Sequence, residues 1–309
     1  MSGEAPMSVS VAIWTCNQEQ FIGEAIESAL DQDYPGIEIV VADDSSDDST
    51  PEIVSDYARR YRDRVRPLLH RGPRSIVANV NRALAACTGE LVATLDGDDF
   101  FLPGKISAQA KAFAIHPDVA ICRHPVQVVD ERGAVIDTVD LHPSLRLAGP
   151  RDLLVHGFFI YTVAAMMLRR SAIPAAGVSP VAEHAPDSLL AIETARGGSI
   201  LRVDKVLASY RRHAGQITAP EPGSEVVFED AIRSIAYVEA TYPELADACP
   251  RARAHLTSWE AHRRRGSADL DWVSAGLRRA LRSAPLNRAL WQAYIGVSAR
   301  RVGTLFKTG

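Results

Sequence analysis

The sequence predicts an α/β fold built on a mostly parallel sheet, and three observations support this. Short apolar runs typical of strands alternate with segments whose apolar residues recur at helical spacing. The chain has 309 residues and is 47% hydrophobic, which suits one large domain or a core of roughly 200 residues with an appendage. Acidic clusters directly follow two predicted strands, at the edge where open parallel sheets bind ligands.

The first predicted unit is a strand, a helix and a second strand. Apolar runs predict strands over 9–14 and 37–42, and apolar residues at helical spacing predict a helix over 21–30. A connection of this length implies that the two strands are parallel and that the helix packs on one face of the sheet, with a right-handed crossover. This unit therefore fixes the direction of the sheet.

The following elements extend the alternation. A helix is expected to begin near Thr50, which we interpret as its N-cap, with Pro51 in the first helical position. The pattern weakens after Pro103, where a mixed α+β completion is expected. The further helices are predicted over 76–87 and 105–115, and the further strands over 65–69, 91–95, 120–122, 126–129, 135–139, 199–203 and 210–213.

The chain is predicted to divide into a flexible N-terminus over 1–7, a domain over 8–217, a Pro- and Gly-containing linker over 218–224 and a helical region over 225–309. Residues 276–309 hold six arginines and one lysine with no acidic residue, although the whole chain carries a net charge of −4. Their apolar residues recur at helical spacing. This basic tail therefore suits either an anionic membrane surface or packing against the domain or a second copy of the chain.

Composition excludes several classes of protein. With 23% charged residues and a net charge of −4, nothing indicates nucleic acid as a partner or a disordered chain. The start lacks the basic and apolar regions of a secretory signal, and the longest apolar stretch, 158–168, is shorter than the roughly 20 residues of a membrane-spanning helix. The four cysteines have no CxxC spacing, which favours reduced core thiols. We expect a cytoplasmic protein, with peripheral contact at the inner membrane face as the open alternative.

Two acidic clusters end two of the predicted strands. Asp43 and Asp44 follow the strand over 37–42, and the segment DGDD at 96–99 follows the strand over 91–95. Because the carboxyl ends of parallel strands share one edge, both clusters should face one crevice. Mg²⁺ or Mn²⁺ is commonly held by one or two carboxylates plus substrate phosphates, so a metal and nucleotide site is expected there. The alternatives are a turn with a helix cap at the first cluster and a solvated loop at the second.

Four segments in this order resemble a known family. They are TCNQEQF, VVADDSSDDST, GELVATLDGDDFFLPGK and YRRHAGQIT, and they resemble the motifs of the inverting family 2 glycosyltransferases over about residues 8–217. The resemblance implies the GT-A nucleotide-diphospho-sugar transferase fold, a Rossmann-like mixed sheet flanked by helices, here with a C-terminal helical extension. It also implies sugar transfer from a nucleotide-diphosphate donor to an acceptor hydroxyl with Mn²⁺ or Mg²⁺. A UDP-sugar is the first expectation, and GDP- and dTDP-sugars stay open.

The resemblance also assigns roles by position. It makes Asp44, supported by Asp43, the reader of the base, and Asp96 the residue that approaches the ribose and the metal. Asp98, which follows Gly97, becomes the principal metal ligand. The remaining residues implied at the nucleotide or its diphosphate are Thr15, Asn17, Arg74, Asn81, Arg211 and His213. Two departures from the family pattern are Cys16 in place of a common tyrosine and Ser45 in place of a common glycine.

The family's general base corresponds most closely to Asp187, in the segment EHAPDSLLAIETARGG. Sugar transfer with inversion needs a base within hydrogen-bond reach of the acceptor hydroxyl. The family's adjacent glutamate is replaced by Pro186, so Glu183 and Glu193 are rival candidates. A further alternative is that Asp187 is a first-turn acid favoured by the helix dipole.

Other functions are weighed against this one. A sugar-nucleotide-binding pseudoenzyme is the alternative if Asp187 is not a base. A haloacid-dehalogenase-type phosphatase also places D-x-D after a buried strand, but on its first strand. A signalling receiver domain pairs acids on its first strand too, whereas here TCN stands on an earlier strand. The acceptor stays open among a glycan, a lipid-linked sugar, a protein and a small metabolite.

Overall fold

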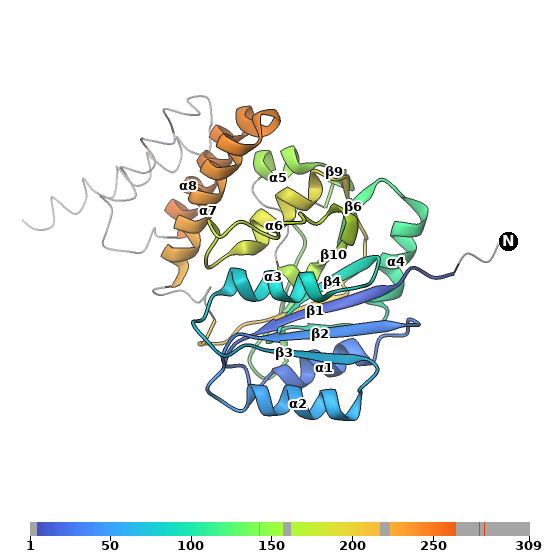
Figure 1. Ribbon diagram of the computed structural model, residues 1–309. Helices are drawn as coiled ribbons and strands as arrows, with labels where there is room; N and C mark the ends of the chain where they lie inside the picture. The colour runs from blue at the N-terminus through green and yellow to red at the C-terminus, as the bar shows by residue number, and fades with distance from the viewer. Residues whose placement is uncertain are drawn as a thin grey trace, which may run out of the picture. The chain divides into compact units, whose positions relative to one another are not determined.

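The computed structural model describes residues 5–141, 143–156, 162–216 and 223–263, together with Arg278 and Leu281 (Figure 1). The chain divides into two compact units. The first consists of Met1–Pro150 with Phe159–Ser224, and the second of Arg151–Phe158 with Glu225–Gly309. All residues that the sequence assigns to a site lie in the first unit.

A mixed sheet of eight strands forms the centre of the first unit, in the order β3-β2-β1-β4-β10-β6-β11-β9. Strands β1 to β4 are parallel, and β10 runs antiparallel between β4 and β6. The bounds are β1 Val9–Thr15, β2 Ile37–Asp43, β3 Val65–Leu69, β4 Leu91–Asp96, β6 Val119–Arg123, β9 Leu147–Ala148, β10 Met166–Arg169 and β11 Ser199–Arg202. The predicted parallel half-sheet is thus confirmed.

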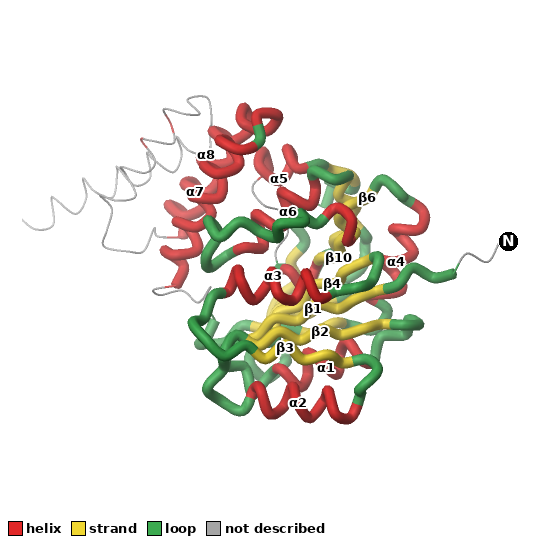
Figure 2. Tube along the Cα trace, in the orientation of Figure 1, coloured by secondary structure: helices red, strands yellow, loops and turns green. Residues whose placement is uncertain are grey.

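Helices cover both faces of this sheet (Figure 2). Helices α1 (Ile22–Leu30), α2 (Thr50–Arg60) and α4 (Lys105–Ile115) contribute to one core cluster on the face that carries Val11 and Ile13 of β1. Helix α3 (Ile76–Ala86) packs against β1 and β2 from the other face. Side chains alternate along a strand, so β1 supplies apolar groups to both layers, and every residue of it is buried.

In a second sheet of four strands, a strand near the end of the first unit pairs with strands from its middle. The strand order of this sheet is β5-β12-β7-β8. Strand β12 (Ala208–Arg211) pairs antiparallel with β5 (Phe100–Phe101) and parallel with β7 (Val126–Val129). Strand β8 (Val135–Val139) pairs antiparallel with β7 and lies at the edge opposite β5. Because β5 directly follows the DGDD segment, its pairing with β12 places the chain after β12 beside those acids.

The remaining described elements are mostly helical. They are α5 (Pro150–His156), η1 (Val163–Ala165), η2 (Arg170–Ala172), α6 (Pro186–Ala195), α7 (Gly223–Thr241), η3 (Pro243–Ala248) and α8 (Cys249–Arg263). Of the predicted linker, residues 218–222 lie outside the described residues, and the last two residues already belong to α7. The predicted basic tail over 276–309 also lies outside them, apart from Arg278 and Leu281.

Two expectations about secondary structure were wrong or incomplete. Thr50 is the first helical residue and not an N-cap; its hydroxyl accepts a hydrogen bond from the backbone N–H of Gln18 at 2.9 Å instead. Strand β10 was not predicted, although its first three residues belong to the long apolar stretch over 158–168. Its first three residues are all buried, so the alternation that marks a half-buried strand is missing.

Two further expectations concern the membrane and the cysteines. Within the described part of the chain, no helix is both long enough and apolar enough to cross a membrane. All four cysteines are free, and Cys87, Cys122 and Cys249 are buried, which agrees with the expected core thiols.

Candidate active site

The predicted site residues gather where β1, β2 and β4 end, at the edge of the sheet where the connecting loops cluster in Figure 2. The strand register places Thr15 opposite Asp43 on one side of β1, and Trp14 opposite Asp96 on the other. The two acidic clusters therefore flank the end of one strand, which confirms that they share an edge of the sheet.

Asp43 is buried and shapes the turn that follows β2. Its carboxylate accepts hydrogen bonds from the backbone N–H of Ser46, at 3.1 Å, and from the Ser46 hydroxyl. The turn places Ser45 in the left-handed region, with φ of 58°. A glycine would adopt this conformation without strain, so serine carries a small conformational cost here.

Asp44 is 3% exposed and lies in an ion pair. Its Oδ1 is 2.8 Å from Nη2 of Arg82, and its Oδ2 accepts from the backbone N–H of Ser75 at 2.7 Å. The same Arg82 nitrogen donates to Oδ1 of Asn79 at 3.0 Å. The predicted reading of the base by Asp44 stays a prediction, and any base that it binds must share a carboxylate already held by two donors.

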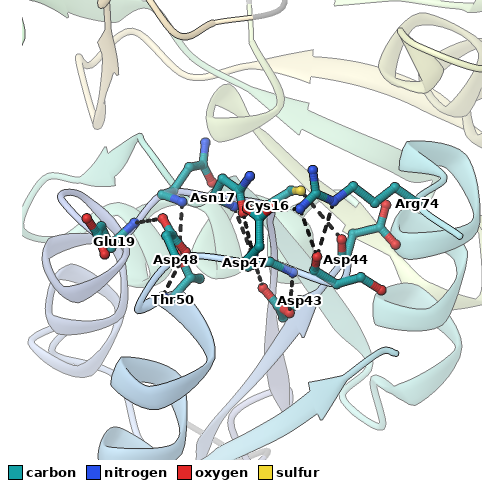
Figure 3. A network of polar contacts seen from close by, with 12 residues as sticks. Cys16, Asn17, Glu19, Asp43, Asp44, Asp47, Asp48, Thr50 and Arg74 are labelled. Carbon is teal, nitrogen blue, oxygen red and sulfur yellow. Dashed lines mark hydrogen bonds and ion pairs between the residues drawn. The ribbon is translucent and has the colours of Figure 1, made fainter. Parts of the chain in front are cut away.

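The lip of the site is a network of polar contacts among loops (Figure 3). Asn17 adopts a left-handed φ of 54°, and its side-chain oxygen accepts from the backbone N–H of Asp47 at 2.9 Å. Arg74 donates to the backbone oxygen of Ser45 at 3.1 Å and pairs with Asp47 at 3.1 Å. The side chain of Arg74 is 44% exposed, so this guanidinium can still reach a ligand.

Cys16 lies beside this network, and its thiol donates to the backbone oxygen of Asp44 at 3.4 Å. Burial raises the pKa of the Cys16 thiol above its usual value. A thiol with a raised pKa is a poor nucleophile at neutral pH. The contacts of Cys16 thus give it a packing role at the lip.

The structure places the two asparagines of helix α3 on different faces. Asn81 bonds with both polar groups of its amide to the backbone of Val178, at 2.8 and 2.9 Å, on the loop that precedes α6. Buried Asn79 instead donates to the backbone oxygens of Ala42 and Thr15, at 2.9 and 3.4 Å. A shift of two residues turns a helical side chain by about 200°, so Asn79 faces the strand ends while Asn81 faces the loop of Val178. The expected contact of Asn81 with the nucleotide stays a prediction.

The DGDD segment begins at the last residue of β4, and each of its three carboxylates has a hydrogen-bond partner. Oδ1 of Asp96 accepts from the indole N–H of Trp14 at 2.5 Å. Oδ2 of Asp98 is 2.9 Å from Nε2 of His213. Asp99 accepts from the backbone N–H of Arg211 at 2.9 Å and from the hydroxyl of Thr162 at 3.0 Å.

Gly97 permits a close approach between this turn and the end of β1. Its backbone N–H donates to the backbone oxygen of Trp14 at 3.1 Å. A Cβ atom at position 97 would lie 2.5 Å from Oε1 of Gln18 and 2.7 Å from Oγ1 of Thr15. Only glycine fits between these groups, which explains the Asp-Gly-Asp spacing without any positive φ.

His213 contacts both an acid and an aromatic ring. Its ring lies 4.7 Å from that of Phe21. Nδ1 accepts from the backbone N–H of Gly215 at 3.3 Å, so the proton of the neutral ring belongs on Nε2. Nε2–H therefore donates to Asp98, and the histidine orients this carboxylate.

Arg211 is buried against the DGDD turn and engages protein groups. Its guanidinium donates to the backbone oxygens of Asp98 and Glu131, each at 3.0 Å, and pairs with Glu24 at 2.5 Å. It also lies over the rings of Phe21 and Phe100. A direct contact with a diphosphate, as the resemblance implies for Arg211, would require the side chain to leave these partners.

Burial raises the pKa of three carboxyl groups at this edge of the sheet. Burial, together with the charges of Asp98 and Asp187, raises the pKa of Asp96 well above its usual range. Burial and the charges of Asp98 and Asp96 do the same for Asp99. Burial raises the pKa of Asp187, which lies in the first turn of α6. The charge of Asp187 also acts on Asp96, which is consistent with a base near the DGDD turn, and the role of Asp187 as the base stays a prediction.

The donor set suits a hard divalent cation completed by a ligand. Among the described residues, no group of three or more His, Cys, Asp or Glu side chains could hold a metal ion alone. Carboxylate oxygens are nevertheless the ligands that Mg²⁺ and Mn²⁺ prefer, and phosphate oxygens and water commonly fill their remaining positions. A cation would also relieve the mutual repulsion of Asp96 and Asp98, so the residues fit such an ion.

Several residues of the site escaped the sequence analysis. These are Trp14, Arg82, Asn79 and Thr162, each bonded to a predicted acid or to the strands beneath it. Asn79 carries a weak signal, since a polar residue on the apolar stripe of a helix needs a buried partner. Trp14 carries another, because a buried indole N–H seeks an acceptor.

More than half of the chain matches a known protein family. Residues 10–174, more than half of the chain, match the model of a family described as glycosyl transferase family 2. An uncharacterized protein of Mycobacterium tuberculosis is 36% identical over 212 residues, which make up 67% of this chain and 59% of that protein. The chain thus matches less than two thirds of the length of this relative.

Solved structures show the same fold. TarS from S. aureus in complex with UDP-GlcNAc is similar with a TM-score of 0.56 and 17% identity, over 96% of this chain and 92% of that one. The mannosyltransferase PcManGT from Pyrobaculum calidifontis, in complex with GDP-Man and Mn²⁺, has a TM-score of 0.58 and 18% identity, over 96% and 88% of the two chains. The likeness confirms the predicted GT-A fold.

Proposed function

The chain belongs to glycosyl transferase family 2, and from this premise we propose that it is an inverting, metal-dependent glycosyltransferase. The donor is a nucleotide-diphosphate sugar, with UDP as its first candidate nucleotide. The contact between Asp98 and His213 carries the proposal, since it joins two motifs 115 residues apart in the chain. Solved relatives of the same fold hold UDP-GlcNAc or GDP-Man with Mn²⁺, which supports this class of donor.

The nucleotide is proposed to bind at the ends of β1 and β2. Thr15 and Asn17 line the lip, Asp44 reads the base with Asp43 supporting its turn, and the exposed guanidinium of Arg74 closes over the ligand. A buried carboxylate beside a lip of backbone groups can accept from the N–H of a base. The absence of a side chain at Gly97 lets the donor approach the strand end closely.

A divalent cation is proposed to bind Asp98 and Asp96 together with the donor diphosphate. When bound, it neutralises the charge that develops on the departing diphosphate. His213 orients Asp98 through the 2.9 Å contact, and Arg211 holds the turn through the backbone oxygen of Asp98. We assign Arg211 a positioning role because its guanidinium bonds to protein groups.

Asp187 is proposed as the general base. Burial raises its pKa, which makes the carboxylate a stronger acceptor of a proton than an exposed aspartate. In the proposed step the acceptor hydroxyl loses its proton to Asp187 while its oxygen bonds to the anomeric carbon. The bond from this carbon to the diphosphate oxygen breaks on the opposite side, so the configuration inverts.

The test measures donor binding and turnover separately. Calorimetry with UDP and Mn²⁺ reports donor binding, and release of UDP from UDP-GlcNAc in water, without an added acceptor, reports slow turnover. Asp187→Asn is expected to bind UDP as the wild type does and to lose at least about 100-fold in UDP release, as for removal of a general base. Full turnover in this variant would place the base elsewhere, with Glu183 and Glu193 as the next candidates.

A sugar-nucleotide-binding pseudoenzyme is the second candidate, because Pro186 stands where the family has a glutamate beside the base. This function would be favoured if the wild-type protein bound UDP with Mn²⁺ but released no nucleotide from any tested UDP-, GDP- or dTDP-sugar. The acceptor class, and contact with a membrane surface or a second copy through residues 225–309, stay predictions.

A further inference from the structure

We propose that Trp14 is a positioning residue of the donor site, which fixes one oxygen of Asp96 and leaves the other to face the ligand. The inference rests on the proposed function and adds to it a residue that none of the four sequence motifs contains. It starts from the register of two neighbouring strands.

Trp14 and Asp96 are direct neighbours in the parallel pairing of β1 and β4. Side chains at paired positions of neighbouring strands leave the sheet on the same face. This face is the one opposite the core cluster that contains Ile13 and Leu95. The indole and the carboxylate therefore emerge side by side, and Nε1 of Trp14 lies 2.5 Å from Oδ1 of Asp96.

A second bond from the same residue holds the following peptide. The backbone oxygen of Trp14 accepts from the N–H of Gly97 at 3.1 Å. Trp14 thus contacts the Asp96 side chain and the peptide after it. The chain direction at the start of the DGDD turn and the rotation of the first carboxylate are fixed together.

The chemistry of the indole makes this contact one-sided. An indole N–H only donates, so it occupies Oδ1 of Asp96 and cannot itself take a cation. Trp14 is 9% exposed, which shields the bond from water. Oδ2 carries no such donor, so Asp96 is expected to bind a cation or a ribose hydroxyl chiefly through this oxygen.

The surrounding charges make such an anchor necessary. The charges of Asp98 and Asp187 both act on the Asp96 carboxylate, and both repel it. The Trp14 N–H is the side-chain donor that opposes this repulsion. Without it, the carboxylate is expected to rotate away from its neighbours and from the position that a cation shared with Asp98 requires.

The test replaces the N–H and keeps the ring. Trp14→Phe, and a variant carrying 3-benzothienylalanine at position 14, both lack the donor, and the second keeps the size and shape of the indole. Calorimetry with UDP or GDP in the presence of Mn²⁺ is expected to show about tenfold weaker binding in both variants, as for loss of a hydrogen bond to a charged group. Thermal unfolding of the free protein checks that the benzothienyl variant is folded.

Tyr57→Phe is the matched control. The Tyr57 hydroxyl donates to Oε1 of Glu27 at 2.5 Å, so this variant also removes an aromatic donor from a carboxylate at the same distance, away from the site. Its affinity for Mn²⁺ and nucleotide is expected to stay within twofold of the wild type. An equal loss in Tyr57→Phe and in the Trp14 variants would overturn the assignment, because it would reflect general destabilisation.

A double-mutant cycle separates positioning from packing. If Trp14 acts through Asp96, the tenfold effect of removing its N–H should disappear in an Asp96→Asn background. An effect of the same size in both backgrounds would overturn the inference. In the wild type, the indole ¹⁵N–¹H resonance of Trp14, assigned by its loss in Trp14→Phe, should shift when Mg²⁺ and UDP are added, and an unmoved resonance would also count against it.

The outcomes distinguish this inference from the proposed function. Wild-type protein that binds neither UDP nor GDP with Mn²⁺ would refute both. Wild-type binding that persists unchanged in the benzothienyl variant would refute the role of Trp14 and leave the proposed function standing.

Discussion

Replacing Arg211 should destabilise the first unit strongly, because its guanidinium is buried under the DGDD turn. Arg211→Met keeps most of the apolar stem and removes the donors to the backbone oxygens of Asp98 and Glu131. It also removes the ion pair with Glu24 and the contacts with the rings of Phe21 and Phe100. The expected magnitude follows from these partners.

The backbone oxygen of buried Asp98, left without its donor, costs about 1–3 kcal/mol, whereas Glu131 is exposed and its oxygen can bond to water instead. The Glu24 side chain is 51% exposed, and its pairing with Arg211 adds less than about 1 kcal/mol after screening by solvent. The ring contacts add about 0.5–2 kcal/mol. We expect Arg211→Met to lower the free energy of unfolding by about 2–5 kcal/mol, a large share of the roughly 5–15 kcal/mol of a typical domain.

Urea unfolding followed by circular dichroism measures this change, and Arg74→Met is the matched control. The Arg74 side chain lies at the lip and is 44% exposed, so its removal should cost less than about 1 kcal/mol. Arg211→Lys should lose about 2 kcal/mol, because one ammonium cannot reach partners spread around a planar guanidinium. If Arg211→Met unfolds within 1 kcal/mol of the wild type while UDP binding is lost, Arg211 contacts the ligand and the positioning role is wrong.

Three further predictions concern the same edge of the sheet. Gly97→Ala should weaken binding of UDP with Mn²⁺ at least about tenfold in calorimetry, because its Cβ would lie 2.5 Å from Gln18 and push the turn outward; unchanged binding would contradict the close approach. Asn79→Ala should cost about 2 kcal/mol in urea unfolding and weaken UDP binding, whereas Asn81→Ala should leave binding within twofold; the reverse order would restore the original match to Asn81. The fold raises the pKa of Asp99, so it holds this proton more tightly than the unfolded chain does, and the stability that the group contributes is present at low pH and lost as the pH rises through the raised pKa. Asp99→Asn should therefore flatten the fall in stability that sets in as the pH rises above about 4, the ordinary value of an aspartate, without a metal, and an unchanged pH profile would contradict the raised pKa.

The parallel half of the sheet was predictable because its signal is local. The apolar runs of β1 and β2 and the stripes of α1 and α2 are periodic, and periodic segments of this length identify their own secondary structure. Strand β10 carries no such signal, because its first three residues are all apolar and buried and show no alternation. Its antiparallel insertion between β4 and β6 depends on contacts with segments more than 40 residues away in the chain.

The site was predictable at the level of motifs and less so at the level of partners. Acids at the ends of parallel strands lie at one edge of the sheet regardless of the loop conformations. The sequence therefore correctly predicted that Asp43 and Asp96 share this edge. The partner of each carboxylate depends on strand register and helix phase, which a sequence does not display. For this reason Trp14 and Arg82 were missed, and the buried bonds of Asn79 were not foreseen.

The contact between Asp98 and His213 illustrates a third case. The two motifs could be recognised separately, but their meeting depends on β12 pairing with β5 directly after the DGDD turn. This pairing joins residues more than 100 positions apart, and its cost in chain entropy is offset by burial of most of β7 and β12. Only the folded chain shows that Asp98 and His213 are in contact.

Metal-dependent donor binding is the most direct test of the central claim that this edge of the sheet binds a nucleotide-sugar diphosphate. Calorimetric titration of the full chain with UDP and with GDP, in Mn²⁺ and then in EDTA, measures it, with Asp98→Asn as the site variant. We predict binding of one or both nucleotides in Mn²⁺, a loss of at least about tenfold in EDTA, and the same loss in Asp98→Asn with Mn²⁺ present. Binding that is equal in Mn²⁺, in EDTA and in Asp98→Asn would contradict the claim that Asp98 and a cation together hold the diphosphate.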